Sequence, residues 1–415
     1  MKRLARAAVQ TGAVLALSAA ALAVMLWLAL RPAAGESRWA LRLGPWPIEL
    51  GAFSTLRVLT HPLALNALQG RTLDTPLGPT RLTAGDAPGT WVAVCTPCTV
   101  AVKALGDAPL RITRGEFTFQ RRGQGEWRGT FALGAPAQAV RGRFSAHLEA
   151  ASATLRFQGI DTPMAAAYAL FAPEIPELRY ARIDGRLRLD GVLALPAATW
   201  TVKPAIDGFR VAGLGTEALL NAEPACARHL AGASFGRWLP RAVIAAEDQR
   251  FYTHTGFDLA EIAAAWSGTQ RRGGSTLSQQ LAKLLFTGDA PDPVRKLREL
   301  LYAVELDRTL GKARVLHLYL SMAPWGEGQC GAHAAALHYL HKPARRLSAI
   351  EAAWLASLLH NPDRAVRRMT RAKQVDAARV GWVIEHLRPL PAARREALRE
   401  LLAGWTAPLH APAPE

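Results

Sequence analysis

The sequence is poor in cysteine, in acidic residues and in aromatic residues, and each shortage narrows the classes of protein to consider. Its 415 residues include four cysteines and 33 Asp and Glu, and 7% of the residues are aromatic. Zinc-finger spacing, an aromatic block of the RNA-recognition type and a long basic run are all missing, which argues against nucleic acid as a partner. Because 50 Lys and Arg stand against the acidic residues, the formal net charge is +17. This dispersed charge favours anionic lipid or a pyrophosphate-bearing substrate.

An uncharged segment at the N-terminus, residues 7–30, predicts a membrane span. It follows a compact basic cluster and is long enough, because a helix needs about 20 apolar residues to cross a bilayer. The positive-inside rule then places the N-terminus in the cytoplasm and the rest of the chain outside. We therefore expect residues 1–34 to hold a retained signal anchor. A cleaved signal peptide, cut near Pro32-Ala33-Ala34, is the alternative.

The cysteines agree with an exported chain, because disulfides persist in oxidising compartments. Cys95 and Cys98 could form a redox pair or half of a zinc site, but the surrounding sequence offers neither a βαβ pattern nor a second pair. A local disulfide that closes a turn is therefore favoured. Cys226 and Cys330 form a second bridge or remain buried thiols, and the sequence leaves both possibilities open.

Residues 35–215 predict an antiparallel β-rich domain outside the membrane. Apolar and polar residues alternate along 38–43, 116–120 and 186–190, as they do in half-buried strands. Turn signals occur at Gly123-Gln124-Gly125, Asp184-Gly185 and Asp190-Gly191. Residues 164–171 predict one short helix within this domain.

Beyond the β-rich region the apolar period becomes helical. Residues 216–404 are rich in Ala and Leu, with Gly and Pro confined to boundaries, which predicts an all-helical domain. The last residues, 405–415, contain repeated Ala and Pro and predict a disordered tail. The sequence therefore describes a multi-domain protein.

Three short motifs follow one another in the helical region. Residues 245–256 read AAEDQRFYTHTG, residues 273–283 read GGSTLSQQLAK, and residues 295–299 read RKLRE. Together they closely resemble the peptidoglycan glycosyltransferases of family 51, lysozyme-like enzymes that polymerise lipid II into glycan strands. The resemblance covers about residues 237–364 and implies an all-α lysozyme-like glycosyltransferase domain.

The first motif supplies a candidate general base. On a helix over residues 241–253, Glu247, Phe251 and His254 have the spacing to face one cleft. Glu247 would then take the proton from the 4-hydroxyl of the acceptor sugar as that oxygen attacks C1 of the donor. Taken without its context, a Glu-Asp pair is more often a solvated part of a helix surface.

The second and third motifs predict a phosphate site. Free N–H groups at the start of a helix, the Ser275 hydroxyl and the Lys283 ammonium would suit a phosphate-bearing group. Arg295, Lys296 and Arg298 lie near a helix N-terminus, where they oppose the helix dipole. Their placement therefore predicts an anionic ligand or a carboxylate partner.

The resemblance implies roles for particular residues. Glu247 and Glu299 are the implied catalytic carboxylates, and a divalent metal, Mg²⁺ or Mn²⁺, would meet the diphosphate beside the basic residues. A structural ion pair between Glu299 and Lys283 is the alternative. The implied substrate-binding residues are Asp248, Phe251, His254, Gly274, Ser275, Thr276, Gln279, Gln280, Lys283, Arg295, Lys296 and Arg298.

The sequence also departs from the family pattern. Ser321 stands where Asn is usual, Leu284 where Asn often follows Lys, and the loop at 287–293 is acidic where many relatives are basic. Ser-x-x-Lys and Lys-Thr-Gly motifs are missing, so we expect no transpeptidase half. A lytic enzyme that cleaves glycan and a non-catalytic envelope scaffold are the alternative functions.

The resemblance implies a place in the cell and a set of partners. Lipid II and the nascent glycan would be the substrates, and the chain would lie in the inner membrane as a single-pass protein with a periplasmic catalytic domain. The β-rich domain would be a spacer or a docking surface for another cell-envelope protein. A version of the chain that starts near Gly215 would then keep its chemistry in detergent.

Overall fold

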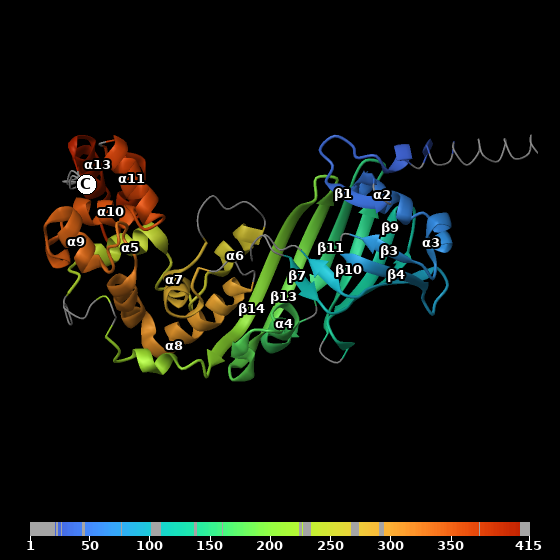
Figure 1. Cartoon of the computed structure of the whole chain (residues 1–415), viewed down its shortest axis with the longest axis horizontal. Helices are drawn as coiled ribbons and strands as arrows, with labels where there is room; N and C mark the ends of the chain where they lie inside the picture. The colour runs from blue at the N-terminus through green and yellow to red at the C-terminus, as the bar shows by residue number, and fades with distance from the viewer. Residues whose placement is uncertain are drawn as a thin grey trace, which may run out of the picture.

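The structure is a computed structural model with two regions arranged along one long axis (Figure 1). One region is built from strands and the other from helices, as the sequence predicts. The structure describes residues 21, 24–25, 27–43, 46–75, 77–100, 109–136, 139–159, 161–223, 226, 234–266, 274–289, 294–372 and 374–406.

The β-rich region contains a ten-stranded antiparallel sheet within the described residues. Its order is β12-β13-β11-β10-β9-β8-β5-β4-β3, and β14 pairs with the other side of β13. The strands are β3 (Thr72–Thr75), β4 (Gly78–Ala84), β5 (Thr90–Cys95), β8 (Gly115–Arg121), β9 (Glu126–Leu133), β10 (Val140–Leu148), β11 (Ala153–Gly159), β12 (Thr162–Pro163), β13 (Arg182–Leu195) and β14 (Thr199–Ala212).

Smaller elements surround this sheet. Two further antiparallel pairs are β1 (Arg38–Leu43) with β2 (Trp46–Gly51), and β6 (Cys98–Val100) with β7 (Leu110–Ile112). The helices of the region are α2 (Ala52–Leu59), α3 (Pro62–Leu68), α4 (Met164–Phe171) and the 3-10 helix η3 (Pro176–Arg179).

Several local predictions are confirmed, and two are wrong. The strands at 38–43 and 116–120 and the helix at 164–171 are present. The signals Asp184-Gly185 and Asp190-Gly191 do not form turns, because both lie inside the 14-residue strand β13, which stays paired to β14. A shift of register between Asp184 and Arg186 accommodates Gly185, whose φ is 109°.

The helical region begins after β14. Its elements are η4 (Thr216–Leu219), α5 (Leu239–Glu247), α6 (Leu259–Trp266), α7 (Leu277–Ala282), the π-helical turn η6 (Lys283–Thr287), α8 (Arg295–Met322), α9 (Ala332–Leu340), η7 (Ala344–Arg346), α10 (Ala349–Ser357), α11 (Pro362–Ala372), α12 (Ala377–His386) and α13 (Ala392–Gly404). Gly311, with φ 72°, interrupts α8. Trp325 and Trp354 are fully buried in the centre of this region.

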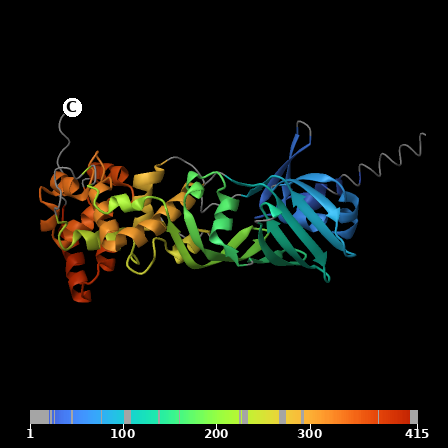
Figure 2. The ribbon, with the colours of Figure 1, turned by 90° about the horizontal axis from the view of Figure 1, so that it is seen from below.

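The two regions share one hydrophobic core. Phe209 and Val211 of β14 belong to the same buried cluster as Phe257 and Leu301 of the helical region. The rings of Phe209 and Phe257 meet edge to face, with centroids 5.7 Å apart. Figures 1 and 2 show the long β13–β14 hairpin reaching the helices, where β14 contacts α6 and α8. A boundary near Gly215 therefore cuts through a common core.

The structure also resolves the cysteine alternatives. Cys95 and Cys98 form the predicted local disulfide. Cys226 and Cys330 form the second bridge rather than two separate thiols. Both pairs are consistent with the exported location predicted from the sequence.

The predicted membrane span and tail lie mostly beyond the part of the chain that the structure describes. Within that part, none of the helices combines the length and the apolar character needed to cross a membrane. Most of residues 7–30, the end of the loop at 287–293 and residues 407–415 are outside it.

Candidate active site

Glu247 is the last residue of α5, and partners from two other helices hold its carboxylate. The Gln280 amide on α7 donates to Oε2 at 3.0 Å. The Arg379 guanidinium on α12 donates to Oε1 at 3.4 Å. The side chain of Glu247 is 11% exposed. The carboxylate is thus fixed in position but not fully enclosed.

The surroundings of Glu247 change its affinity for a proton. Burial raises the pKa of its carboxyl, because a low-dielectric environment disfavours the charged form. The hydrogen bond from Gln280 and the charge of Arg379 lower this pKa, whereas the nearby charge of Asp248 raises it. The net direction is upward, and a carboxylate with a raised pKa is a stronger base.

Tyr319 on α8 orients the Gln280 amide. Its hydroxyl donates to Gln280 Oε1 at 2.8 Å, so the amide NH₂ group is directed at Glu247. Burial raises the pKa of Tyr319 well above its ordinary value, which keeps the hydroxyl protonated as a donor. Sequence reasoning assigned neither Tyr319 nor Arg379 to the site. Tyr319 lies two residues before Ser321 in a segment that resembles the family pattern, whereas Arg379 lies 132 residues after Glu247 and has no local signal.

The helix predicted over residues 241–253 is wrong in its second half. Helix α5 ends at Glu247, and Asp248 leaves helical geometry with φ −154° and ψ 75°. The Asp248 carboxylate accepts a hydrogen bond from the Leu277 N–H at 2.9 Å and lies 3.0 Å from His254 Nε2. Asp248 therefore attaches the end of α5 to the start of α7.

Phe251 and His254 support the site from inside the protein. Phe251 is 0% exposed, and the Lys312 ammonium lies 4.6 Å from its ring centroid. Lys312 Nζ also lies 3.2 Å from His254 Nδ1. The prediction that Phe251 and His254 face an open cleft with Glu247 does not hold, because both are packed against Lys312.

The start of α7 is already hydrogen-bonded. Besides the contact of Leu277 with Asp248, the Thr276 hydroxyl accepts the Gln279 N–H at 3.2 Å, and Gln279 Oε1 accepts the Thr276 N–H at 3.0 Å. This capping box explains why the predicted helix begins here. These N–H groups are occupied rather than free, which contradicts their predicted availability for phosphate. Gly274 lies in the segment that leads into Thr276.

Gly256 allows the backbone of the first motif to lie directly against α8. Its φ is 91°, and an added Cβ atom would lie 2.4 Å from the carbonyl oxygen of Ala303. The carbonyl of Gly256 accepts the Thr276 hydroxyl at 2.7 Å. The glycine that ends the first motif is therefore required for the close approach of all three motifs.

The second and third motifs meet at Lys296. Its ammonium donates to the Ser275 hydroxyl at 2.6 Å and to Glu299 Oε2 at 2.7 Å. Arg295 pairs with the other oxygen of Glu299, which is 0% exposed. The cations therefore have the carboxylate partner that their position predicts. Together Arg295 and Lys296 exceed the charge of Glu299 by one, which leaves the cluster positive.

Two basic residues of the predicted site have other partners. Lys283 pairs with Asp289 in the acidic loop, so the alternative ion pair between Lys283 and Glu299 is not formed. Arg298 pairs with Glu177 of η3 in the β-rich region. Arg298 is next to Glu299 in sequence, yet its guanidinium is directed at the other region of the protein.

The described residues do not fit a metal held by protein ligands alone. Within them, no group of three His, Cys, Asp or Glu side chains comes together. Glu299 is paired with two cations, and Asp248 already has two partners. The divalent metal implied by the resemblance stays a prediction.

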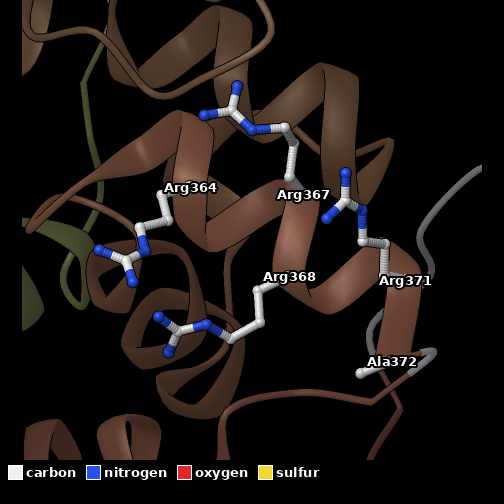
Figure 3. A pocket seen from close by; sticks show the side chains of 5 residues that line it. All are labelled: Arg364, Arg367, Arg368, Arg371 and Ala372. Carbon is white, nitrogen blue, oxygen red and sulfur yellow. The ribbon is translucent and has the colours of Figure 1, made fainter.

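A basic surface lies on α11, in the helical region. Its side chains, named here the α11 arginine face, are Arg364, Arg367, Arg368 and Arg371, which line a shallow hollow with Ala372 (Figure 3). The opposite side of α11 is packed inward through Val366 and Met369. Arg368 lies 3.7 Å from Asp376, and no ion pair of the other three arginines occurs within the described chain.

Comparison with known proteins identifies the helical region. Residues 224–388 match the family model described as Transglycosylase. These residues form a transglycosylase domain. It contains every element that holds Glu247, Glu299, Gln280, Tyr319 and Arg379.

Curated relatives agree with this identification. The biosynthetic peptidoglycan transglycosylase of Nitrosomonas eutropha is 49% identical over 129 residues, which is 30% of this chain and 53% of the relative. The protein of that name from Laribacter hongkongensis is 42% identical over 149 residues, 33% of this chain and 65% of the relative. The one from Klebsiella oxytoca is 43% identical over 158 residues, 37% of this chain and 64% of the relative. The chain thus spans about half to two thirds of the length of these relatives.

Proposed function

We propose that this protein is a peptidoglycan glycosyltransferase that polymerises lipid II into β-1,4-linked glycan strands and releases undecaprenyl pyrophosphate. The observation that carries the proposal is the environment of Glu247 in the transglycosylase domain. Its carboxylate is largely buried, is held by Gln280 and Arg379, and has a raised pKa. The names of the relatives support the same reaction.

Glu247 would be the general base of the transfer. Its carboxylate would accept the proton of the acceptor 4-hydroxyl while that oxygen forms a bond to C1 of the donor sugar. The bond from C1 to the pyrophosphate oxygen would break on the opposite face, so an α-linked donor would give a β-linked product. Gln280 and Tyr319 would keep the carboxylate oriented towards the acceptor.

The cluster of Ser275, Arg295, Lys296 and Glu299 would stabilise the departing pyrophosphate. It is positive overall, and charge-assisted hydrogen bonds to phosphate are among the stronger polar interactions in proteins. Glu299 would fix the two cations rather than react, because both of its oxygens are engaged in ion pairs. A lysozyme-like arrangement of the domain is part of this proposal.

The substrate also suggests where the protein works. Lipid II is held in a membrane by its polyprenyl chain, so the domain would lie at the periplasmic face of the inner membrane. The predicted single-pass anchor at residues 7–30, with a cytoplasmic N-terminus, would keep it there. Membrane lipid, lipid II and the nascent glycan would then be its partners.

One assay tests the proposal against its alternatives. The full-length protein in detergent is incubated with lipid II and, separately, with mature peptidoglycan. Glycan polymer formed from lipid II would support the transferase. Soluble muropeptides released from peptidoglycan would identify a lytic enzyme. If neither product forms, the non-catalytic envelope scaffold is the remaining function.

The same assay tests the role of Glu247. Glu247→Gln preserves the shape of the side chain but cannot accept the proton, so we expect a loss of 10²–10⁴-fold, roughly, in polymerisation. Glu396→Gln is the matched control, because Glu396 is an exposed residue of α13 with 58% of its side chain accessible. Activity of Glu247→Gln within about twofold of the control would show that Glu247 is not the base.

A further inference from the structure

Helix α8 begins without the groups that usually stabilise a helix N-terminus. Val294 at the N-cap makes no side-chain cap, and the first turn has no acidic residue. It carries Arg295, Lys296 and Arg298 instead, and such cations are unfavourable at the positive end of the helix dipole. The first turn of α8 therefore depends on two carboxylates that lie beyond it, Glu299 in the next turn of the same helix and Glu177 from elsewhere in the fold.

One of these carboxylates comes from the β-rich region. Glu177 in η3 is 0% exposed, and its Oε1 accepts from Arg298 Nε at 2.9 Å and lies 2.7 Å from Arg298 Nη2. A buried carboxylate with a fork-shaped partner is held more rigidly than a surface pair. Glu177 is thus a fixed counter-charge for the first turn of α8.

A second contact from the β-rich region lies one residue away. The Tyr168 hydroxyl on α4 donates to the carbonyl oxygen of Leu297 at 3.1 Å. Tyr168 is 3% exposed and belongs to the core that joins the two regions. Leu297 and Arg298 are therefore both attached to the β-rich region.

The residues on either side of this pair belong to the proposed pyrophosphate site. Lys296 contacts Ser275 and Glu299, and Glu299 holds Arg295. The two residues that contact the β-rich region, Leu297 and Arg298, thus lie directly between residues of the proposed site. Since successive residues of a helix advance by only about 1.5 Å, the turn cannot move at Arg298 without moving at Lys296 and Glu299.

We propose that Glu177 is a positioning residue for the transfer reaction, through which the β-rich region sets the geometry of the pyrophosphate-binding cations. This inference rests on the proposed function for the identity of the anion. It assigns to the β-rich region a part in the active site, in addition to any role as a spacer or docking surface. The relatives above match only 30–37% of this chain.

The test compares Glu177→Gln with Thr216→Val in the full-length protein. The Thr216 hydroxyl donates to the buried Glu305 carboxylate at 3.0 Å, so this control also removes a contact of α8 with the segment that joins the regions. It does so farther along α8 than Glu299. The first measurement is binding of inorganic pyrophosphate by titration calorimetry, and the second is the Michaelis constant and kcat for lipid II.

We expect Glu177→Gln to weaken pyrophosphate binding about tenfold and to raise KM for lipid II more than it lowers kcat. Thr216→Val should bind pyrophosphate as the wild type does, even if both variants melt at lower temperature. Equal pyrophosphate affinity in the wild type and Glu177→Gln would overturn the inference, and so would an equal loss in both variants. If Glu177→Gln does not fold, Arg298→Lys keeps the charge but not the fork, and unchanged pyrophosphate binding there would overturn it as well.

The two proposals fail in different ways. If the wild-type protein binds pyrophosphate but forms no polymer, the proposed function is wrong. The role of Glu177 is then decided by comparing pyrophosphate binding in the wild type and in Glu177→Gln. If the wild-type protein forms polymer but Glu177→Gln binds pyrophosphate equally well, the proposed function stands and the positioning role of Glu177 is wrong.

Discussion

Replacement of Gln280 by Met tests the arrangement around Glu247 most directly. Met has a similar length but cannot donate a hydrogen bond, so the 3.0 Å contact with the Glu247 carboxylate is lost. That contact lowers the pKa of Glu247, in opposition to burial. Its removal must therefore raise the pKa further, and a larger fraction of the base is protonated at low pH.

The size of the effect follows from the strength of the contact. A hydrogen bond to a charged group contributes roughly 1.5–3 kcal/mol, and one pKa unit corresponds to about 1.36 kcal/mol. Arg379 remains in place, and water can reach the exposed 11% of the Glu247 side chain. We therefore take the lower end of this energy range, which corresponds to a rise of about one unit in the pKa of Glu247. At pH values below the acidic limb, the variant should then be about tenfold less active than the wild type. Above the limb the difference should disappear.

The assay is the pH profile of kcat/KM for lipid II polymerisation. The acidic limb of Gln280→Met should be displaced by about one unit towards alkaline pH, and its activity should recover as the pH rises. Gln69→Met, at an exposed position after α3, is the control for the same substitution elsewhere. A variant that loses activity equally at every pH would show that Gln280 does not act through the pKa of Glu247.

Three further predictions concern stability and binding. Phe251→Ala should lower the free energy of unfolding by about 3–5 kcal/mol in a urea titration, because Phe251 is fully buried; a loss below about 1 kcal/mol would contradict its role in the core. Changing the four arginines of the α11 arginine face to Gln should weaken binding to anionic vesicles by about 1 kcal/mol for each arginine that lies near the membrane surface. Binding to neutral vesicles should not change. Equal binding to anionic vesicles before and after the change would show that this face does not contact the membrane. A chain that starts at Gly215 should melt at lower temperature than the full chain or precipitate, which differential scanning calorimetry would detect, and an unchanged melting temperature would show that the shared core is dispensable.

Local pattern was sufficient to predict the secondary structure where apolar and polar residues alternate along the sequence. Strands β1 and β8 lie where this alternation predicts them, and helix α4 lies at the predicted residues. The pattern failed at Asp190-Gly191, because a dipeptide that favours a turn can remain in a strand whose neighbour continues to pair with it. It also failed after Glu247, where contacts of Asp248 with Leu277 and His254 end the helix. Long-range partners decide both cases.

The same limit applies to the candidate site. The sequence identified Glu247, Gln280, Lys296 and Glu299, since they lie inside short motifs with a recognisable order. It could not show that Tyr319 orients Gln280 or that Arg379 reaches Glu247, because these residues come close only after the helices pack. Nor could it show that Phe251 is fully buried while 11% of the Glu247 side chain stays exposed, although both were expected on one face of a helix.

The boundary between the two regions was the hardest feature to infer, because no local pattern in the sequence shows that two segments share one hydrophobic core. The change from period two to a helical period near Gly215 is a change of secondary structure, and it need not coincide with an energetic boundary. Phe209 and Val211 alternate in β14 as in any half-buried strand, and only the fold shows that their buried side faces α6 and α8. Burial of Glu305 against the N–H groups of Leu214 and Thr216 fixes the crossing segment to α8 as well. A perturbation of the β13–β14 hairpin should therefore reach α8 near Glu305, beyond the first turn, which Glu177 and Tyr168 hold separately.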